Sequence, residues 1–105
     1  MSLTAPVDES RDHVRGGSAQ GAVTLLVYGD YECPYTRRAY RGIQRLERAW
    51  GEGLRFAFRH FPLREIHPHA QMASEIAEEA AVQDRFWPMH DLLFHRQQAL
   101  ERDDL

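Results

Sequence analysis

The chain has 105 residues, of which 43% are hydrophobic and 28% are charged, and its formal net charge is -3. A chain of this length is expected to fold as one domain around a single core. Its thirteen basic residues are all arginine and are interleaved with sixteen acidic ones, which argues against a nucleic-acid partner. No apolar run approaches the roughly 20 residues that cross a bilayer, and no signal peptide is visible, so we expect no membrane insertion and a cytoplasmic location.

The first fifth of the chain differs in character from the rest. Residues 1–20 are rich in Ser, Gly, Asp and Arg and lack apolar periodicity, so they predict a flexible leader before a domain over residues 21–105. Residues 22–28 are nearly all apolar, include β-branched members and have glycine on both sides. This run predicts a strand with both faces covered, and residues 29–32 predict a turn after it.

A helix is predicted to begin at Pro34, because apolar residues then recur at three- and four-residue steps and proline suits the first helical turn. Glycines at positions 51 and 53 are expected to close it. The apolar face is predicted to contain Ala39, Ile43, Leu46 and Trp50. Cys33 then lies directly after a strand and at the N-terminus of a helix, where free N–H groups and the positive end of the helix dipole favour a thiolate.

The remaining elements complete an α/β pattern. Residues 54–61 alternate in polarity and end at Pro62, which predicts a second strand, parallel to the first through a right-handed crossover. Small residues at helical spacing predict a closely packed helix over residues 69–83. Asp84 is expected to cap a further helix that carries Phe86, Met89, Leu92, Leu93 and Leu100.

Four separated blocks of this sequence, residues 28–35, 59–63, 67–70 and 86–94, resemble DsbA-like proteins of the thioredoxin fold. The resemblance runs over residues 12–105 and is strongest to a bacterial subgroup found alone or attached to sodium/proton antiporters. It implies a thioredoxin-like βαβ unit followed by a helical segment, and a thiol–disulfide oxidoreductase activity. It also implies that Cys33 is the attacking cysteine, with Pro34 and Tyr35 beside it in the active-site motif.

The chain departs from this family at the resolving cysteine, whose place in the Cys-x-x-Cys motif is taken by Thr36. Cys33 can therefore form a mixed disulfide but must wait for an outside thiol, such as glutathione, to release the partner. The Thr36 hydroxyl is expected to donate a hydrogen bond to the Cys33 thiolate. The expected catalytic set is Cys33, Pro34, Tyr35 and Thr36, with glutathione as external thiol and no other cofactor.

A second departure concerns the end of the family's domain. Family members continue into a β-hairpin, a last helix and a cis-proline that faces the reactive cysteine, and nothing in this sequence matches that segment. Residues 22–28 would then keep an open apolar edge, which favours a homodimer. Two alternatives stay open: the chain is a fragment of a longer protein, or its helical part covers the edge.

His67 and His69 are two residues apart and His90 and His95 five apart, so neither pair has the spacing of two metal ligands on one helical face, and we expect no metal site. Tyr31 and Tyr35 are predicted to form an apolar rim around the thiol. The alternative function is a redox-inactive, thioredoxin-like interaction or regulatory module, and a third is a redox sensor that dimerises through a disulfide between two copies of Cys33.

Overall fold

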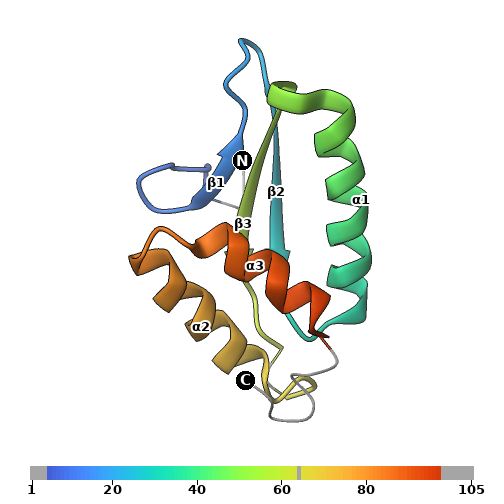
Figure 1. Cartoon of the computed structure of the whole chain (residues 1–105), viewed down its shortest axis with the longest axis vertical. Helices are drawn as coiled ribbons and strands as arrows, with labels where there is room; N and C mark the ends of the chain where they lie inside the picture. The colour runs from blue at the N-terminus through green and yellow to red at the C-terminus, as the bar shows by residue number, and fades with distance from the viewer. Residues whose placement is uncertain (1–4, 64, 98–105) are drawn as a thin grey trace.

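The computed structural model describes residues 5–63 and 65–97. Within that part of the chain, a three-stranded sheet packs against three α-helices (Figure 1). The elements in chain order are β1 (His13–Gly16), β2 (Val23–Gly29), α1 (Pro34–Trp50), the 3-10 turn η1 (Gly51–Gly53), β3 (Leu54–His60), α2 (Ala70–Val82) and α3 (Phe86–His95). This confirms the predicted α/β, thioredoxin-like fold.

The sheet has the strand order β1-β3-β2. Strand β2 runs parallel to β3, with Val27 opposite Phe58, and α1 forms the crossover between them. Strand β1 runs antiparallel to β3 on its other side and places His13 opposite the same Phe58. Residues opposite each other share a face of the sheet, so His13, Val27 and Phe58 lie on one face. The predicted βαβ unit is therefore present, with β1 added beside it.

The presence of β1 corrects the prediction of a flexible leader over residues 1–20. Residues 13–16 form a strand, and its side chains contact elements far along the chain. His13 stacks on Phe86 with the ring centroids 3.6 Å apart, and the Arg15 guanidinium lies 4.5 Å from the Trp87 ring centroid. A four-residue strand is too short to show periodicity in the sequence, and its order comes from these distant contacts.

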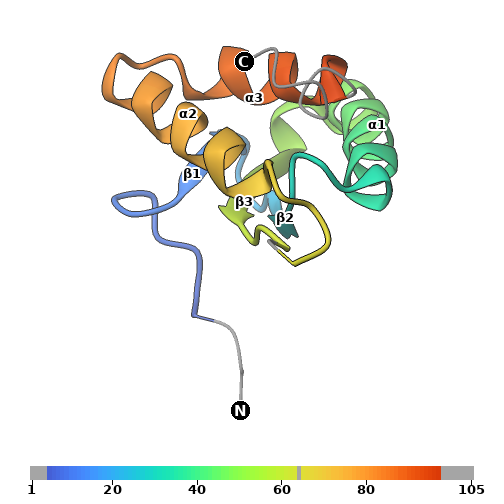
Figure 2. The same cartoon turned by 90° about the horizontal axis from the view of Figure 1, so that it is seen from below.

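All three helices lie on one face of the sheet (Figure 2). The core between them is largely aromatic, and Phe56 and Phe58 from β3 are each 1% exposed. Ala73 and Ala77 of α2 are fully buried, so the predicted small-residue face does pack closely against its neighbours. The buried core cluster contains Tyr31, Tyr40, Ile43, Phe56, Phe58, Ala73, Ala77, Phe86, Leu93 and Phe94.

Two details of the predicted burial are wrong. On α1 the buried residues are Tyr40 and Ile43, whereas Leu46 and Trp50 are 40% and 53% exposed. The Tyr40 ring stacks on α3 and its hydroxyl donates to Asp91 at 3.0 Å, and this contact sets the rotation of the helix.

Strand β2 is also less covered than predicted, because the helices cover only one face of the sheet (Figure 2). Among the described strands β2 lies at the edge of the sheet, next to β3 alone. Val23, at the start of the strand, is 54% exposed, and Tyr28, on the face opposite to Val27, is 47% exposed. The predicted Leu100 contact lies outside the described residues.

Candidate functional site

The thiol lies where β2 passes into α1. Cys33 has extended backbone angles and is the N-cap residue of α1, and Pro34 takes the first helical position. The Cys33 N–H donates to the carbonyl of Asp30 at 3.0 Å, and its own carbonyl accepts from the N–H of Arg37 at 3.0 Å. The backbone on both sides of the cysteine is therefore fixed, with the side chain at the positive end of the helix dipole.

Gly29 lets this turn pack against the sheet. A Cβ atom added to Gly29 would lie 2.3 Å from Cε1 of Phe58 and 2.9 Å from Cγ2 of Thr36. Real Cβ atoms do not approach other atoms so closely, so any side chain here would displace the core or the first turn of α1. In the sequence this glycine only marks the boundary between the predicted strand and the turn. Its packing role follows from the tertiary structure.

Two buried carboxylates bind the turn to the loop after β3. Asp30 accepts hydrogen bonds from the N–H of Leu63 at 2.9 Å and from Nδ1 of His67 at 2.8 Å, and its other oxygen accepts from the N–H of Glu32 at 2.8 Å. Glu32 in turn accepts from the backbone N–H of His69. Both carboxylates are almost fully buried. Two acidic residues in a turn beside Cys33 are the only sequence signal for this arrangement, because their partners in the loop after β3 lie 33 or 37 residues away.

A side chain just beyond α3 also holds the turn. Gln97 is 8% exposed, and its Nε2 donates to the carbonyls of Tyr31 and Cys33 at 2.8 and 3.0 Å. These bonds satisfy two buried acceptors around the thiol. No sequence pattern marked Gln97, because it is 64 residues from Cys33.

Of the two tyrosines predicted to form an apolar rim around the Cys33 thiol, only one lies at the surface beside it. Cys33 is a free cysteine and is 9% exposed. Tyr35 is 76% exposed beside it, with the Arg38 guanidinium 5.8 Å from its ring centroid. Tyr31 is fully buried in the core, so the prediction that it forms a rim around the thiol is wrong.

Thr36 is placed differently from the expected thiolate donor. In the described part of the chain its hydroxyl makes no hydrogen bond to Cys33, and its methyl group lies towards Gly29. Thr36 also lines a small apolar space together with Val27, Tyr40 and Phe58. The side chain therefore contributes packing beneath the turn in this structure.

His67 and His90 have structural roles. His67 bonds to Asp30, as described above, and His90 is 1% exposed in the core. Nδ1 of His90 lies 2.9 Å from the hydroxyl of Tyr31. Burial lowers the pKa of His90 to about 3, and burial raises the pKa of Tyr31, so a protonated phenol donates to a neutral imidazole.

Three other side chains, those of His13, His60 and Glu78, place their potential metal-ligand atoms within 4.8 Å of one another.

Comparison with known proteins places the chain in a family. The thioredoxin family model matches residues 9–105. The chain is 46% identical over 105 residues to the sodium/proton antiporter NhaA 3 of Salinispora tropica, 45% to NhaA 1 of Salinispora arenicola and 42% to NhaA 1 of Mycolicibacterium gilvum. Each match covers 100% of this chain but only 16% or 17% of the relative.

The chain thus spans about a sixth of the length of these relatives, and a domain of its kind occurs within proteins named as antiporters. No solved structure matches it. Over the residues that the structure describes, no helix is both long and apolar enough to cross a membrane. From its sequence match and its fold, the chain belongs to the thioredoxin family.

Proposed function

We propose that this domain performs thiol–disulfide exchange through Cys33 alone, as a monothiol. The observation that carries the proposal is the position of Cys33 as N-cap residue of α1, directly before Pro34 and with no second cysteine in the chain. The unpaired N–H groups of the first helical turn favour a negatively charged sulfur, and the thiolate is the nucleophile in disulfide exchange.

The exchange has two steps. The Cys33 thiolate attacks one sulfur of a disulfide, which forms a mixed disulfide with Cys33 and releases the other sulfur as a thiolate. An external thiolate then attacks the partner's sulfur in the mixed disulfide, forms a new disulfide with it and returns Cys33 as a thiolate. Glutathione is the external thiol we propose, because no resolving cysteine follows at position 36.

The fixed backbone of the site supports a defined direction of attack. Asp30 and Gln97 hold the two sides of the cysteine backbone, so the sulfur has little freedom apart from its own side-chain rotation. With an exposed fraction of 9%, Cys33 offers a narrow approach, and the exposed Tyr35 ring is the apolar surface beside it. A small or extended disulfide fits this access better than a disulfide inside a folded partner.

The test is the reaction of the reduced chain with oxidised glutathione, followed by mass spectrometry. We expect a single glutathione on Cys33, formed faster than on the urea-unfolded chain at the same pH, and removed by added reduced glutathione. The Cys33→Ser variant should gain no glutathione. If the native chain reacts more slowly than the unfolded chain, monothiol exchange by Cys33 is contradicted.

The second candidate function is a redox-inactive interaction or regulatory module. The low exposure of Cys33 and the absence of a resolving cysteine favour it. The glutathione experiment separates the two candidates, because an interaction module needs no reactive thiol. A disulfide between two copies of Cys33, visible on a non-reducing gel, would instead support a redox sensor.

We propose further that the domain is a cytoplasmic homodimer. Strand β2 is at the edge of the described sheet, and its free backbone groups together with Val23 and Tyr28 offer a surface for a second copy. Pairing of two β2 strands would cover backbone groups that have no strand partner within the described part of a single copy.

A further inference from the structure

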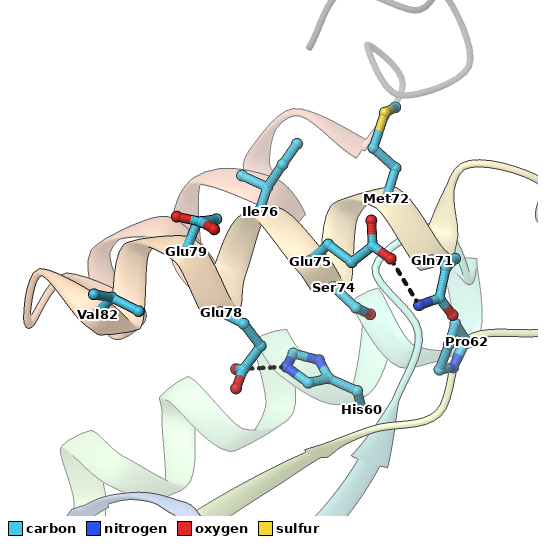
Figure 3. A pocket seen from close by; sticks show the side chains of 10 residues that line it. All are labelled: His60, Pro62, Gln71, Met72, Ser74, Glu75, Ile76, Glu78, Glu79 and Val82. Atoms are coloured by element: carbon cyan, nitrogen blue, oxygen red, sulfur yellow. Dashed lines mark hydrogen bonds and ion pairs between the residues drawn. The ribbon is translucent and has the colours of Figure 1, made fainter.

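A cluster of two histidines and one glutamate lies between β1, β3 and α2. Oε2 of Glu78 is 2.5 Å from Nε2 of His13 and 2.9 Å from Nε2 of His60. The potential ligand atoms of all three residues lie within 4.8 Å of one another. Figure 3 shows the His60 ring and the Glu78 carboxylate pointing towards each other across the gap between β3 and α2.

We infer that His13, His60 and Glu78 bind a divalent transition-metal ion, with zinc as the ion that the ligand set fits best. Two imidazole nitrogens and one carboxylate oxygen form a three-ligand zinc set that leaves a fourth position open for water or another ligand. Zinc needs these atoms at about 2.0–2.2 Å from the ion. Because both Nε2 atoms already face the same carboxylate, small side-chain movements suffice to place an ion between the three.

The surrounding structure holds the two rings in place. The His13 ring stacks on Phe86 with centroids 3.6 Å apart. The His60 ring packs edge-on against Phe58 and Phe86, with centroids 5.6 and 6.0 Å away. The side chains of His13 and His60 are 24% and 21% exposed, and that of Glu78 is 52% exposed. The ligands are therefore oriented by the core, while the site stays open to solvent on the Glu78 side.

The open side faces a groove of about 740 Å³ along α2. His60 and Glu78 form part of its wall, and Glu75 and Glu79 line the same groove (Figure 3). Three carboxylates along one groove favour a cation there. Arg15, the nearby cation on β1, is already paired with Glu47 and Asp91 and so opposes the metal little.

The expected affinity is modest. Nδ1 of His60 is buried and has no hydrogen-bond partner among the described residues. A metal-bound histidine usually donates its other N–H to an acceptor, and loss of such an acceptor weakens binding roughly 10- to 100-fold. We therefore expect zinc to bind more weakly than at a site whose histidines all donate to such an acceptor.

The test is a zinc titration of the tag-free chain, followed by isothermal calorimetry and by competition with a chromogenic chelator. We expect one zinc ion per chain. Glu78→Gln should weaken binding at least 10-fold, whereas Glu79→Gln, which removes the same charge one residue along α2 but no proposed ligand, should weaken it far less. His13→Asn should abolish binding, with His95→Asn as its exposed control.

Cobalt offers a second readout that is independent of the titration, since tetrahedral Co²⁺ gives visible absorption bands. The proposal predicts these bands in the Cys33→Ser variant as in the unchanged chain. Circular dichroism of each variant confirms folding, and Glu78→Gln decides the case if His13→Asn does not fold. The inference is overturned if no zinc binds, if Glu78→Gln binds like the unchanged chain, or if Cys33→Ser removes the site.

Discussion

The hydroxyl of Tyr31 lies 2.9 Å from Nδ1 of His90, and both side chains are buried although 59 residues separate them. Tyr31 belongs to the turn that carries Cys33, and His90 lies in the middle of α3. The bond therefore links the candidate thiol site to the helix that crosses the sheet. Gln97, beyond the same helix, adds a second link through the carbonyls of Tyr31 and Cys33.

The buried His90 should make the stability of the fold depend on pH. Its folded-state pKa is lowered to about 3 by burial, so the unfolded chain takes up the proton first as the pH falls below 6.5. Stability is then complete above about pH 6.5 and decreases towards pH 3, by up to about 1.4 kcal/mol per pH unit. Urea unfolding from pH 7 to pH 4 in the presence of a chelator measures this slope.

The His90→Asn variant isolates this contribution, because asparagine offers Tyr31 an oxygen acceptor but does not titrate. We expect a lower free energy of unfolding at pH 7 and a slope flatter by about 1 kcal/mol per pH unit. The exposed His95 provides the control, and His95→Asn should keep the original slope. Equal slopes in His90→Asn and in the unchanged chain would contradict a lowered pKa of His90 in the folded state.

Gly29 should tolerate no side chain. In Gly29→Ala the new methyl group meets Phe58 and Thr36, and such overpacking lowers the free energy of unfolding by about 2 kcal/mol. Gly42 in α1 is the matched control, because the nearest atom to its added Cβ is the end of the Arg45 side chain at 3.9 Å. Gly42→Ala should raise stability by roughly 0.5–1 kcal/mol. A neutral Gly29→Ala variant in thermal and urea unfolding would mean that the turn can move away from the sheet.

Arg15 should be needed for the order of β1. It donates to both carboxylate oxygens of Glu47 at 2.8 and 3.0 Å and lies over Trp87. We expect Arg15→Met to lower the free energy of unfolding by about 1–2 kcal/mol, a reduced value because the pair is partly exposed. Hydrogen exchange of residues 13–16 should increase in this variant and stay unchanged in Arg41→Met, whose arginine is exposed on α1. Unprotected amides at 13–16 in the unchanged chain would instead support a flexible leader.

Thr36→Cys should restore a dithiol. The new thiol would lie three residues after Cys33 in the first turn of α1, the spacing of the family motif. We expect an internal disulfide after mild oxidation and release of a bound partner without external thiol. Arg37→Cys is the control, since it adds a thiol one position out of register. The measurement is the number of free thiols before and after oxidation, and equal behaviour of the two variants would refute the proposed alignment.

The exposed β2 edge should mediate self-association. Light scattering over a range of concentrations should show a dimer, and combined Val23→Lys and Tyr28→Lys changes should shift it to the monomer by charge repulsion. Trp50→Lys replaces an equally exposed hydrophobic residue on α1 and should leave the dimer intact. A monomer at all concentrations would contradict the proposed homodimer.

The sequence by itself determined the βαβ unit and the place of Cys33 within it. The apolar run before Gly29, the proline after Cys33 and the helical spacing beyond it are local patterns, and local patterns fix the type and order of elements. The thiol at the N-terminus of α1 follows from these patterns, whereas the thioredoxin-like fold was implied by the resemblance of four sequence blocks to DsbA-like proteins.

Only the tertiary structure decided which side chains meet. Strand β1 lacks a pattern of its own and is ordered by contacts with α1 and α3, and Tyr40 rather than Leu46 faces the core because of its contacts with α3. His13 and Glu78 are 65 residues apart, so no spacing rule could pair them. Periodicity states which side of an element is apolar, whereas the partner of each side chain depends on how distant elements pack, and that packing brings together the proposed metal ligands.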